Sequence, residues 1–126
     1  MISLRTGVDL VEISRFKSVV ERHGRRFLER VFTLQELEEV GEVNGKMASL
    51  AARFAAKEAV SKAFGTGIGL LTWREIQILR GPEREPVLYF SGTAARMAEE
   101  QKLSAWSVSL SHTEQYAIAM VVALGG

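Results

Sequence analysis

The sequence predicts an α+β fold in which a mostly antiparallel sheet packs against helices. The expected elements follow the order strand, three helices, two strands, helix, two strands. A doubly wound parallel sheet needs regular alternation of strands and helices, and that alternation is absent. The chain has 126 residues, of which 47% are hydrophobic, and this favours a single domain over residues 1–126 with a core of its own.

The first half of the sequence changes from a strand period to a helical period. Apolar residues alternate over residues 2–8 and then recur at helical spacing from Leu10 until Gly24, which ends or bends that helix. Thr33 and Glu36 form a capping box that starts a short acidic helix. The two helices expected after the first one cover residues 34–43 and 47–64, and Gly65 caps the second.

The second half predicts four strands and one helix. "EIQILR" at residues 75–80 alternates as a strand, and the turn "GPEREP" separates it from a second strand, "VLYF". A short helix follows, capped by Ser91 or Thr93. The strands "AWSVSLS" and "YAIAMVVAL" are separated only by "HTEQ", which predicts a hairpin.

Composition excludes several classes of protein. The net charge of +1 provides no global field that would attract nucleic acid or an anionic membrane. The chain has no cysteine, which excludes disulfides, thiolate zinc sites and cysteine nucleophiles and fits a reducing cytoplasm. No stretch approaches the roughly 18 apolar residues of a membrane span. We therefore expect a cytoplasmic protein with no membrane and no nucleic-acid partner.

Charge is concentrated on the predicted helix 47–64, one side of which is nearly all alanine. Glu58 and Lys62 lie one turn apart on one flank, whereas Arg53 and Lys57 lie on the opposite flank of the expected exposed ridge. Taken alone, Glu58 and Lys62 are an ordinary i,i+4 pair worth roughly 0.2–0.5 kcal/mol. Arg53 and Lys57 alone are typical of a solvated helix face.

A second carboxylate adds a chemical interpretation. Asp9 follows the first strand and precedes a helix, so one reading is that it caps the helix. The other reading pairs Asp9 with Glu58, because two carboxylates from separate elements could hold Mg²⁺ against a phosphorylated ligand. Lys57 and Lys62 would then offset the remaining phosphate charge.

Four blocks of sequence carry a family resemblance. They are "GVDLVEISR" at 7–15, "RFLERVFTLQE" at 26–36, "ARFAAKEAVSKAFGTGIG" at 52–69 and "VSLSHTEQYAIAMVV" at 108–122. Together they resemble bacterial holo-[acyl-carrier-protein] synthase, the short single-domain type of 4'-phosphopantetheinyl transferase. The resemblance implies transfer of phosphopantetheine from coenzyme A to a serine of apo acyl carrier protein, in support of fatty acid biosynthesis. It also implies Mg²⁺ and a homotrimer with active sites between subunits.

The resemblance assigns roles residue by residue. Asp9 and Glu58 match the two metal-binding acids, and Lys62 matches a lysine expected near the diphosphate. Glu58, directly or through a metal-bound water, is also our candidate for the general base. The residues expected to bind or border coenzyme A are Arg53, Lys57, Gly65, Gly67 and Gly69, with Ser111, His112 and Thr113 of the S-H-T turn near its nucleotide phosphates.

The expected docking surface for the carrier is a basic patch on the first helix and the segment after it. Its cations are Arg15, Lys17, Arg22, Arg25, Arg26 and Arg30. Arg15 matches a carrier contact of the family, and we expect Arg22 and Arg26 to join it. Acyl carrier proteins are typically acidic, so this patch suits electrostatic docking. A solvated helix paired with the acidic helix that follows is the plainer interpretation.

Other functions remain open at the level of sequence. A related transferase with a wider carrier range is usually about twice this length. A non-catalytic module would bind coenzyme A at the same metal site without consuming it, and a structural trimer would bind no ligand. The loop 81–86 departs from the family in having Glu85 before Pro86, and we expect this loop to lie away from the chemistry.

Overall fold

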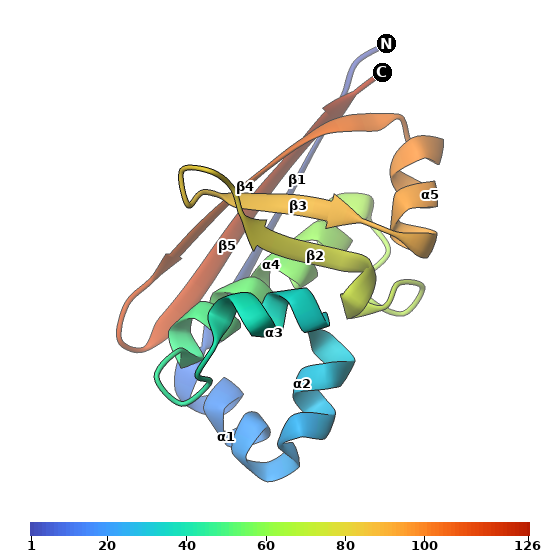
Figure 1. The fold of residues 1–126 in the computed structure, drawn as a ribbon. Coiled ribbons are helices and arrows are strands. Elements are labelled where there is room, and N and C mark those ends of the chain that lie inside the picture. The colour runs from blue at the N-terminus through green and yellow to red at the C-terminus, as the bar shows by residue number, and fades with distance from the viewer.

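A computed structural model describes residues 1–126 and confirms the predicted α+β class. Its antiparallel strands and its helices are drawn in Figure 1. None of the helices combines the length and the apolar character needed to cross a bilayer. The elements are β1 (Ser3–Glu12), α1 (Ile13–His23), α2 (Arg25–Val31), α3 (Leu34–Val40), α4 (Met47–Phe64), η1 (Trp73–Glu75), β2 (Ile76–Arg80), β3 (Pro86–Phe90), α5 (Gly92–Glu100), β4 (Leu103–His112) and β5 (Tyr116–Gly125).

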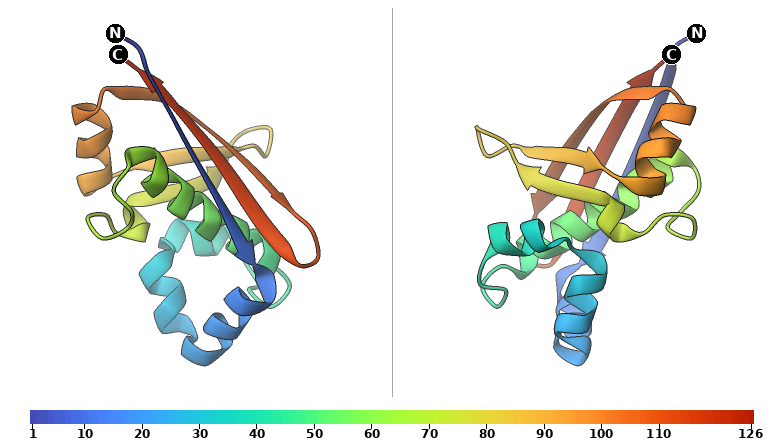
Figure 2. Two further views of the ribbon diagram at one scale, coloured as in Figure 1. Left: turned by 180° about the vertical axis from the view of Figure 1, so that it is seen from behind. Right: turned by 45° about the vertical axis from the view of Figure 1, so that its right-hand side comes forward.

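Two antiparallel sheets flank the long helix α4. The larger sheet has the strand order β1-β5-β4, and the smaller one pairs β2 with β3. Figure 2 shows α4 crossing one face of the larger sheet, while α1, α2 and α3 gather around one end of α4. Because β1 pairs with β5 from Ser3↔Gly125 to Glu12↔Tyr116, the first and last strands lie side by side and the two termini are neighbours (Figure 1).

Small residues let α4 lie directly on the sheet. The helix face that meets the sheet carries buried alanines, among them Ala59 and Ala63, and β5 presents Ala119 and Ala123 to it. Gly7 of β1 is buried at the closest approach, where an added Cβ would overlap the carbonyl group of Ala59. The absence of a side chain at Gly7 therefore sets the distance between β1 and α4.

The structure corrects two expectations in the first half. Strand β1 continues to Glu12, which is itself the N-cap residue of α1, so Asp9 lies within the strand and does not cap a helix. Gly24 does end α1, with a φ of 59°. A separate helix, α2, begins immediately after it, and the sequence did not predict this helix as a distinct element. The capping box of Thr33 and Glu36 is confirmed.

Arg53 and Lys57 do not belong to an exposed ridge, which corrects the sequence-based interpretation. Both are buried, with 3% and 0% of their surface exposed, because α3 and β2 cover this flank of α4. Lys57 Nζ lies 2.7 Å from Glu36 Oε1 and also donates to the carbonyls of Ile76 and Trp73 at 2.6 and 3.1 Å. Burial lowers the pKa of Lys57 to about 8, although the neighbouring Glu36 carboxylate opposes this shift.

We predict that Gly7→Ala destabilises the protein and reduces its activity, because the new methyl group would push β1 away from α4. The expected loss in free energy of unfolding is about 1–3 kcal/mol or more, measured by denaturant titration. Gly45→Ala is the matched control, since an added Cβ there meets no atom within 4 Å. Equal stabilities for the two variants would contradict the role given to Gly7.

Candidate active site

Asp9 and Glu58 line one cavity, hereafter the acid cavity, of about 400 Å³. Asp9 comes from β1 and Glu58 from α4, so the close packing at Gly7 brings the two acids to the same hollow. Arg15 of α1 lines the cavity as well. Glu12, at the end of β1, also lines it. The rest of the wall is apolar and consists of Leu10, Val11, Phe16, Val19, Phe27 and Phe54.

Lys62 bonds to Asp9 and not to Glu58. Its Nζ donates to Asp9 Oδ1 at 3.0 Å and to the Val8 carbonyl at 2.9 Å. The ordinary i,i+4 pair with Glu58 is therefore not formed, and that interpretation is wrong. Glu58 Oε1 accepts a hydrogen bond from Trp73 Nε1 at 3.0 Å instead. The lysine and the two acids thus form a group that spans β1 and α4.

The donor set of the acid cavity fits a hard divalent cation only if other ligands complete its shell. No cluster of three or more His, Cys, Asp or Glu side chains that could hold a metal occurs in the protein. Of the three carboxylates that line the cavity, Glu12 accepts a hydrogen bond from the Ser14 hydroxyl. The other two, Asp9 and Glu58, match the usual protein share of a Mg²⁺ site, whose remaining ligands are water and substrate oxygens. Asp9 and Glu58 would therefore hold the ion together with a phosphorylated ligand.

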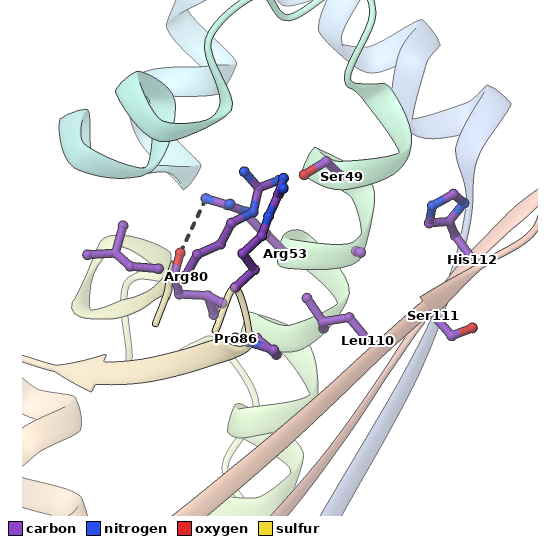
Figure 3. A pocket seen from close by; sticks show the side chains of 11 residues that line it. Ser49, Arg53, Arg80, Pro86, Leu110, Ser111 and His112 are labelled. Carbon is purple, nitrogen blue, oxygen red and sulfur yellow. Dashed lines mark hydrogen bonds between the residues drawn. The ribbon is translucent and has the colours of Figure 1, made fainter. Parts of the chain in front are cut away.

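A second cavity, hereafter the anion cavity, has a volume of about 320 Å³ and opens beside the opposite flank of α4. Arg53, Arg80, Arg84 and His112 all line it. Figure 3 shows the Arg53 and Arg80 side chains together on one side of the cavity and His112 across from them. Arg53 pairs with Glu39 at 2.7 Å, whereas Arg80 and Arg84 form no salt bridge. The cavity therefore has uncompensated positive charge suited to an anion.

The loop 81–86, which we expected to lie away from the chemistry, contributes to the wall of this cavity. Arg84, with a φ of 67°, and Pro86 both line the hollow. Ser111 lines it too, although Figure 3 shows its hydroxyl turned away from the arginines. Thr113 lies in the β4–β5 turn, where its hydroxyl accepts hydrogen bonds from the backbone of Gln115 and Tyr116.

The glycine segment lies at a third and larger cavity of about 850 Å³. Gly65 caps α4 in the left-handed conformation and Gly67 also has a positive φ, so both positions require glycine. Gly69 and Trp73 line the cavity. No lining residue is shared with the acid cavity, but Trp73 reaches Glu58 from this side.

The turn η1 that carries Trp73 is capped by Glu75. Glu75 accepts hydrogen bonds from the backbone N–H groups of Thr72 and Thr93, at 3.0 and 2.6 Å. Partial burial opposes ionisation of Glu75, yet these bonds outweigh it and lower the pKa of the carboxyl. Glu75 thereby ties η1 to the start of α5.

Lys57 takes no part in any of these cavities. Its ammonium group is enclosed between Glu36 and backbone carbonyls and has no exposed surface. A bound nucleotide could reach it only if that buried ion pair broke. We therefore assign Lys57 to the core and not to the ligand site.

Comparison with known proteins shows the family of this chain. The family model described as "4'-phosphopantetheinyl transferase superfamily" matches residues 5–121. The chain belongs to this superfamily. It is 48% identical to a holo-[acyl-carrier-protein] synthase of Ruminiclostridium cellulolyticum, over 94% of this chain and 91% of the relative. The resemblance drawn from the four sequence blocks is confirmed.

Solved structures of transferases from this family have the same fold. The holo-[acyl-carrier-protein] synthase of Neisseria meningitidis matches with a TM-score of 0.86 and 36% identity, covering 94% of this chain and 96% of the other. The Helicobacter pylori synthase, solved in complex with coenzyme A, matches with a TM-score of 0.83 and 34% identity over 94% and 98% of the two chains. The similarity extends over nearly the full length of each protein.

Three residues of these cavities were missed by sequence reasoning. Arg80 and Arg84 lie at the end of a strand and in a turn, where a surface charge carries no distinctive signal. Trp73 follows the glycine segment, and nothing in its local sequence indicates contact with a carboxylate of α4 that lies 15 positions earlier in the chain. Only the folded arrangement brings these side chains to ligand-sized hollows.

Proposed function

We propose that this protein transfers the 4'-phosphopantetheine group of coenzyme A to a serine of apo acyl carrier protein, in support of fatty acid biosynthesis. The products are the holo carrier and adenosine 3',5'-bisphosphate. The observation that carries the proposal is the acid cavity, which Asp9 and Glu58 line while Lys62 bonds to Asp9, in a member of the superfamily. The names of its relatives support the same reaction and the coenzyme.

The reaction needs positioned groups and charge stabilisation more than covalent help from the protein. The serine oxygen bonds to the phosphorus that carries pantetheine, while the bond from that phosphorus to the bridging oxygen breaks. When bound by Asp9 and Glu58, Mg²⁺ supplies charge neutralisation at the diphosphate. Lys62, held beside Asp9 by its bond to the Val8 carbonyl, stabilises the charge that grows on the leaving oxygen.

Glu58 is the proposed general base for the serine hydroxyl. Its Oε1 is bonded to Trp73, whereas its Oε2 has no partner in the protein and remains available to accept a proton. It would accept the serine proton directly or through one water molecule. The nucleotide phosphates of coenzyme A are proposed to bind Arg53, Arg80, Arg84 and His112 of the anion cavity.

We predict that Asp9→Asn and Glu58→Gln each abolish transfer while leaving the fold intact, because each removes one carboxylate. The assay mixes purified protein, coenzyme A, Mg²⁺ and apo carrier and weighs the carrier by mass spectrometry. The wild-type protein should add one phosphopantetheine. Binding of coenzyme A without any gain in carrier mass would instead support a non-catalytic module, and a double variant with a near-normal rate would contradict the metal assignment.

The carrier is proposed to dock across α1 and the start of α2. Arg15 and Arg22 are seven residues apart in α1 and share one face, and both are exposed, as is Arg26 of α2. Arg15 also lines the acid cavity, so an acidic partner bound here would lie next to the reacting groups. The apolar wall of that cavity, with Val19 and Phe27, offers a place for an apolar side chain of the carrier.

We predict that Arg22→Glu combined with Arg26→Glu raises KM for the carrier at least 10-fold and leaves KM for coenzyme A nearly unchanged, an effect that weakens as salt is added. Arg96→Glu combined with Lys102→Glu is the matched control, because it changes net charge equally on and just after α5. Steady-state kinetics at two salt concentrations measure both constants. Equal effects of the two double variants would argue against docking at α1 and α2.

Assembly into a homotrimer is proposed from the uncovered face of the larger sheet. This face is apolar and exposed, and its Cα partners Val8 and Met120 are 52% and 50% exposed. Its other exposed apolar side chains are Leu4, Leu10, Ile118 and Leu124. The acid and anion cavities share no lining residue on one chain. We therefore propose that one coenzyme A spans the anion cavity of one subunit and the acid cavity of its neighbour.

We predict that two inactive variants restore each other when co-expressed. Glu58→Gln lacks a working acid cavity, and Arg80→Ala combined with Arg84→Ala lacks a working anion cavity. Mixed trimers would contain interfaces with one intact cavity of each kind, and transfer should return to a substantial fraction of the wild-type rate. Activity no greater than the sum of the separate variants would place both cavities in a single subunit. Sedimentation of Met120→Lys, expected to be monomeric, tests the interface itself.

Two further assignments remain proposals. We treat residues 1–126 as one transferase domain because α4 takes part in both hydrophobic clusters of the core. We propose the cytoplasm as the location, in keeping with a composition that lacks cysteine.

A further inference from the structure

Trp73 makes the one hydrogen bond that the Glu58 carboxylate receives from the protein. The indole Nε1 donates to Glu58 Oε1 at 3.0 Å, and the ring lies on the side of the third cavity. Lys62, one turn further along α4, is engaged by Asp9, and Glu58 has no salt bridge. The orientation of this carboxylate therefore depends on a neutral side chain from η1.

Trp73 is itself held from two sides. Its carbonyl oxygen accepts from Lys57 Nζ at 3.1 Å, and Lys57 is fixed in the core by Glu36 at 2.7 Å. Its ring packs against Phe54, with the ring centroids 5.9 Å apart and the planes tilted by 38°. The buried ion pair thus positions the backbone of Trp73, and Phe54 restrains its indole.

A neutral donor has a specific advantage at this position. An indole N–H fixes one carboxylate oxygen without cancelling the charge of the group, whereas a lysine or arginine would neutralise the carboxylate and compete with a cation. The second oxygen, Oε2, has no protein hydrogen bond. Partners of this kind behind a ligating side chain typically contribute about 10- to 100-fold to metal affinity or activity.

We propose that Trp73 is a positioning residue that orients Glu58 in the acid cavity, and that the buried pair of Lys57 and Glu36 holds Trp73 in place. The inference rests on the proposed function of Glu58 as a cation ligand and base. In this proposal Lys57 affects the reaction indirectly, because it holds Trp73, which in turn orients Glu58. Trp73 touches no reacting atom in this scheme.

The test replaces Trp73 by phenylalanine, which keeps an aromatic ring against Phe54 and removes the donor. We expect the half-saturating Mg²⁺ concentration in the transfer assay to rise about 10- to 100-fold, with KM for the carrier unchanged. Trp106→Phe is the matched control, because Trp106 packs against Phe64 and Phe90 and donates to the Leu103 carbonyl. An unchanged Mg²⁺ requirement in folded Trp73→Phe would overturn the proposal.

A second measurement keeps Trp73 in place and needs no transfer activity. The chain has two tryptophans, so Trp106→Phe leaves Trp73 as the only indole. Mg²⁺ added with coenzyme A should change the Trp73 emission, and the further change Glu58→Ala should abolish that response. A Trp73 emission that does not change when Mg²⁺ and coenzyme A are added would overturn the inference. A wild-type protein that binds the cation in this way but modifies no carrier would refute the proposed function alone.

Discussion

The contact between β1 and α4 at Gly7 determines the geometry of the candidate active site. A strand and a helix with ordinary side chains between them would lie further apart, and Lys62 could then not reach both the Val8 carbonyl and Asp9. The alanines of α4 and β5 extend this close packing along the interface. Steric exclusion at one glycine therefore places the acid of the strand beside the charged groups of the helix.

The charged side chains of α4 have different surroundings on the two flanks of the helix. On one flank, Glu58 lines the acid cavity and Lys62 bonds to Asp9, which lines the same cavity. On the other, Lys57 and Arg53 pair with Glu36 and Glu39 of α3 and bind carbonyls of β2. Breaking a buried pair of this kind by removing one partner costs about 3–5 kcal/mol, because the remaining charge stays buried. The flank with Arg53 and Lys57 thus joins α3 and the small sheet to α4. The flank with Glu58 is left open to the acid cavity.

Local patterns predicted most elements, and tertiary contacts decided what those patterns could not. The capping box at Thr33 and the cap at Gly65 depend on neighbouring residues, and both appear as predicted. The helical wheel separated Arg53 and Lys57 from Glu58 correctly, but it contains no information about which flank another element covers. The pairing of Asp9 with Glu58 was one of two readings of the residues, and the family resemblance favoured it. Arg84 and Trp73 became recognisable only in the folded structure, where distant segments meet.

The pairing of the first strand with the last has a consequence for synthesis of the protein. Asp9 is held in the sheet opposite Ala119, and β1 has no other strand neighbour. Strand β1 therefore cannot pair with another strand until β5 has been synthesised. Contacts between such distant segments slow folding because a long loop must close first. A polypeptide that ends before β5 would contain both acids but would lack the strand that holds β1 in the sheet.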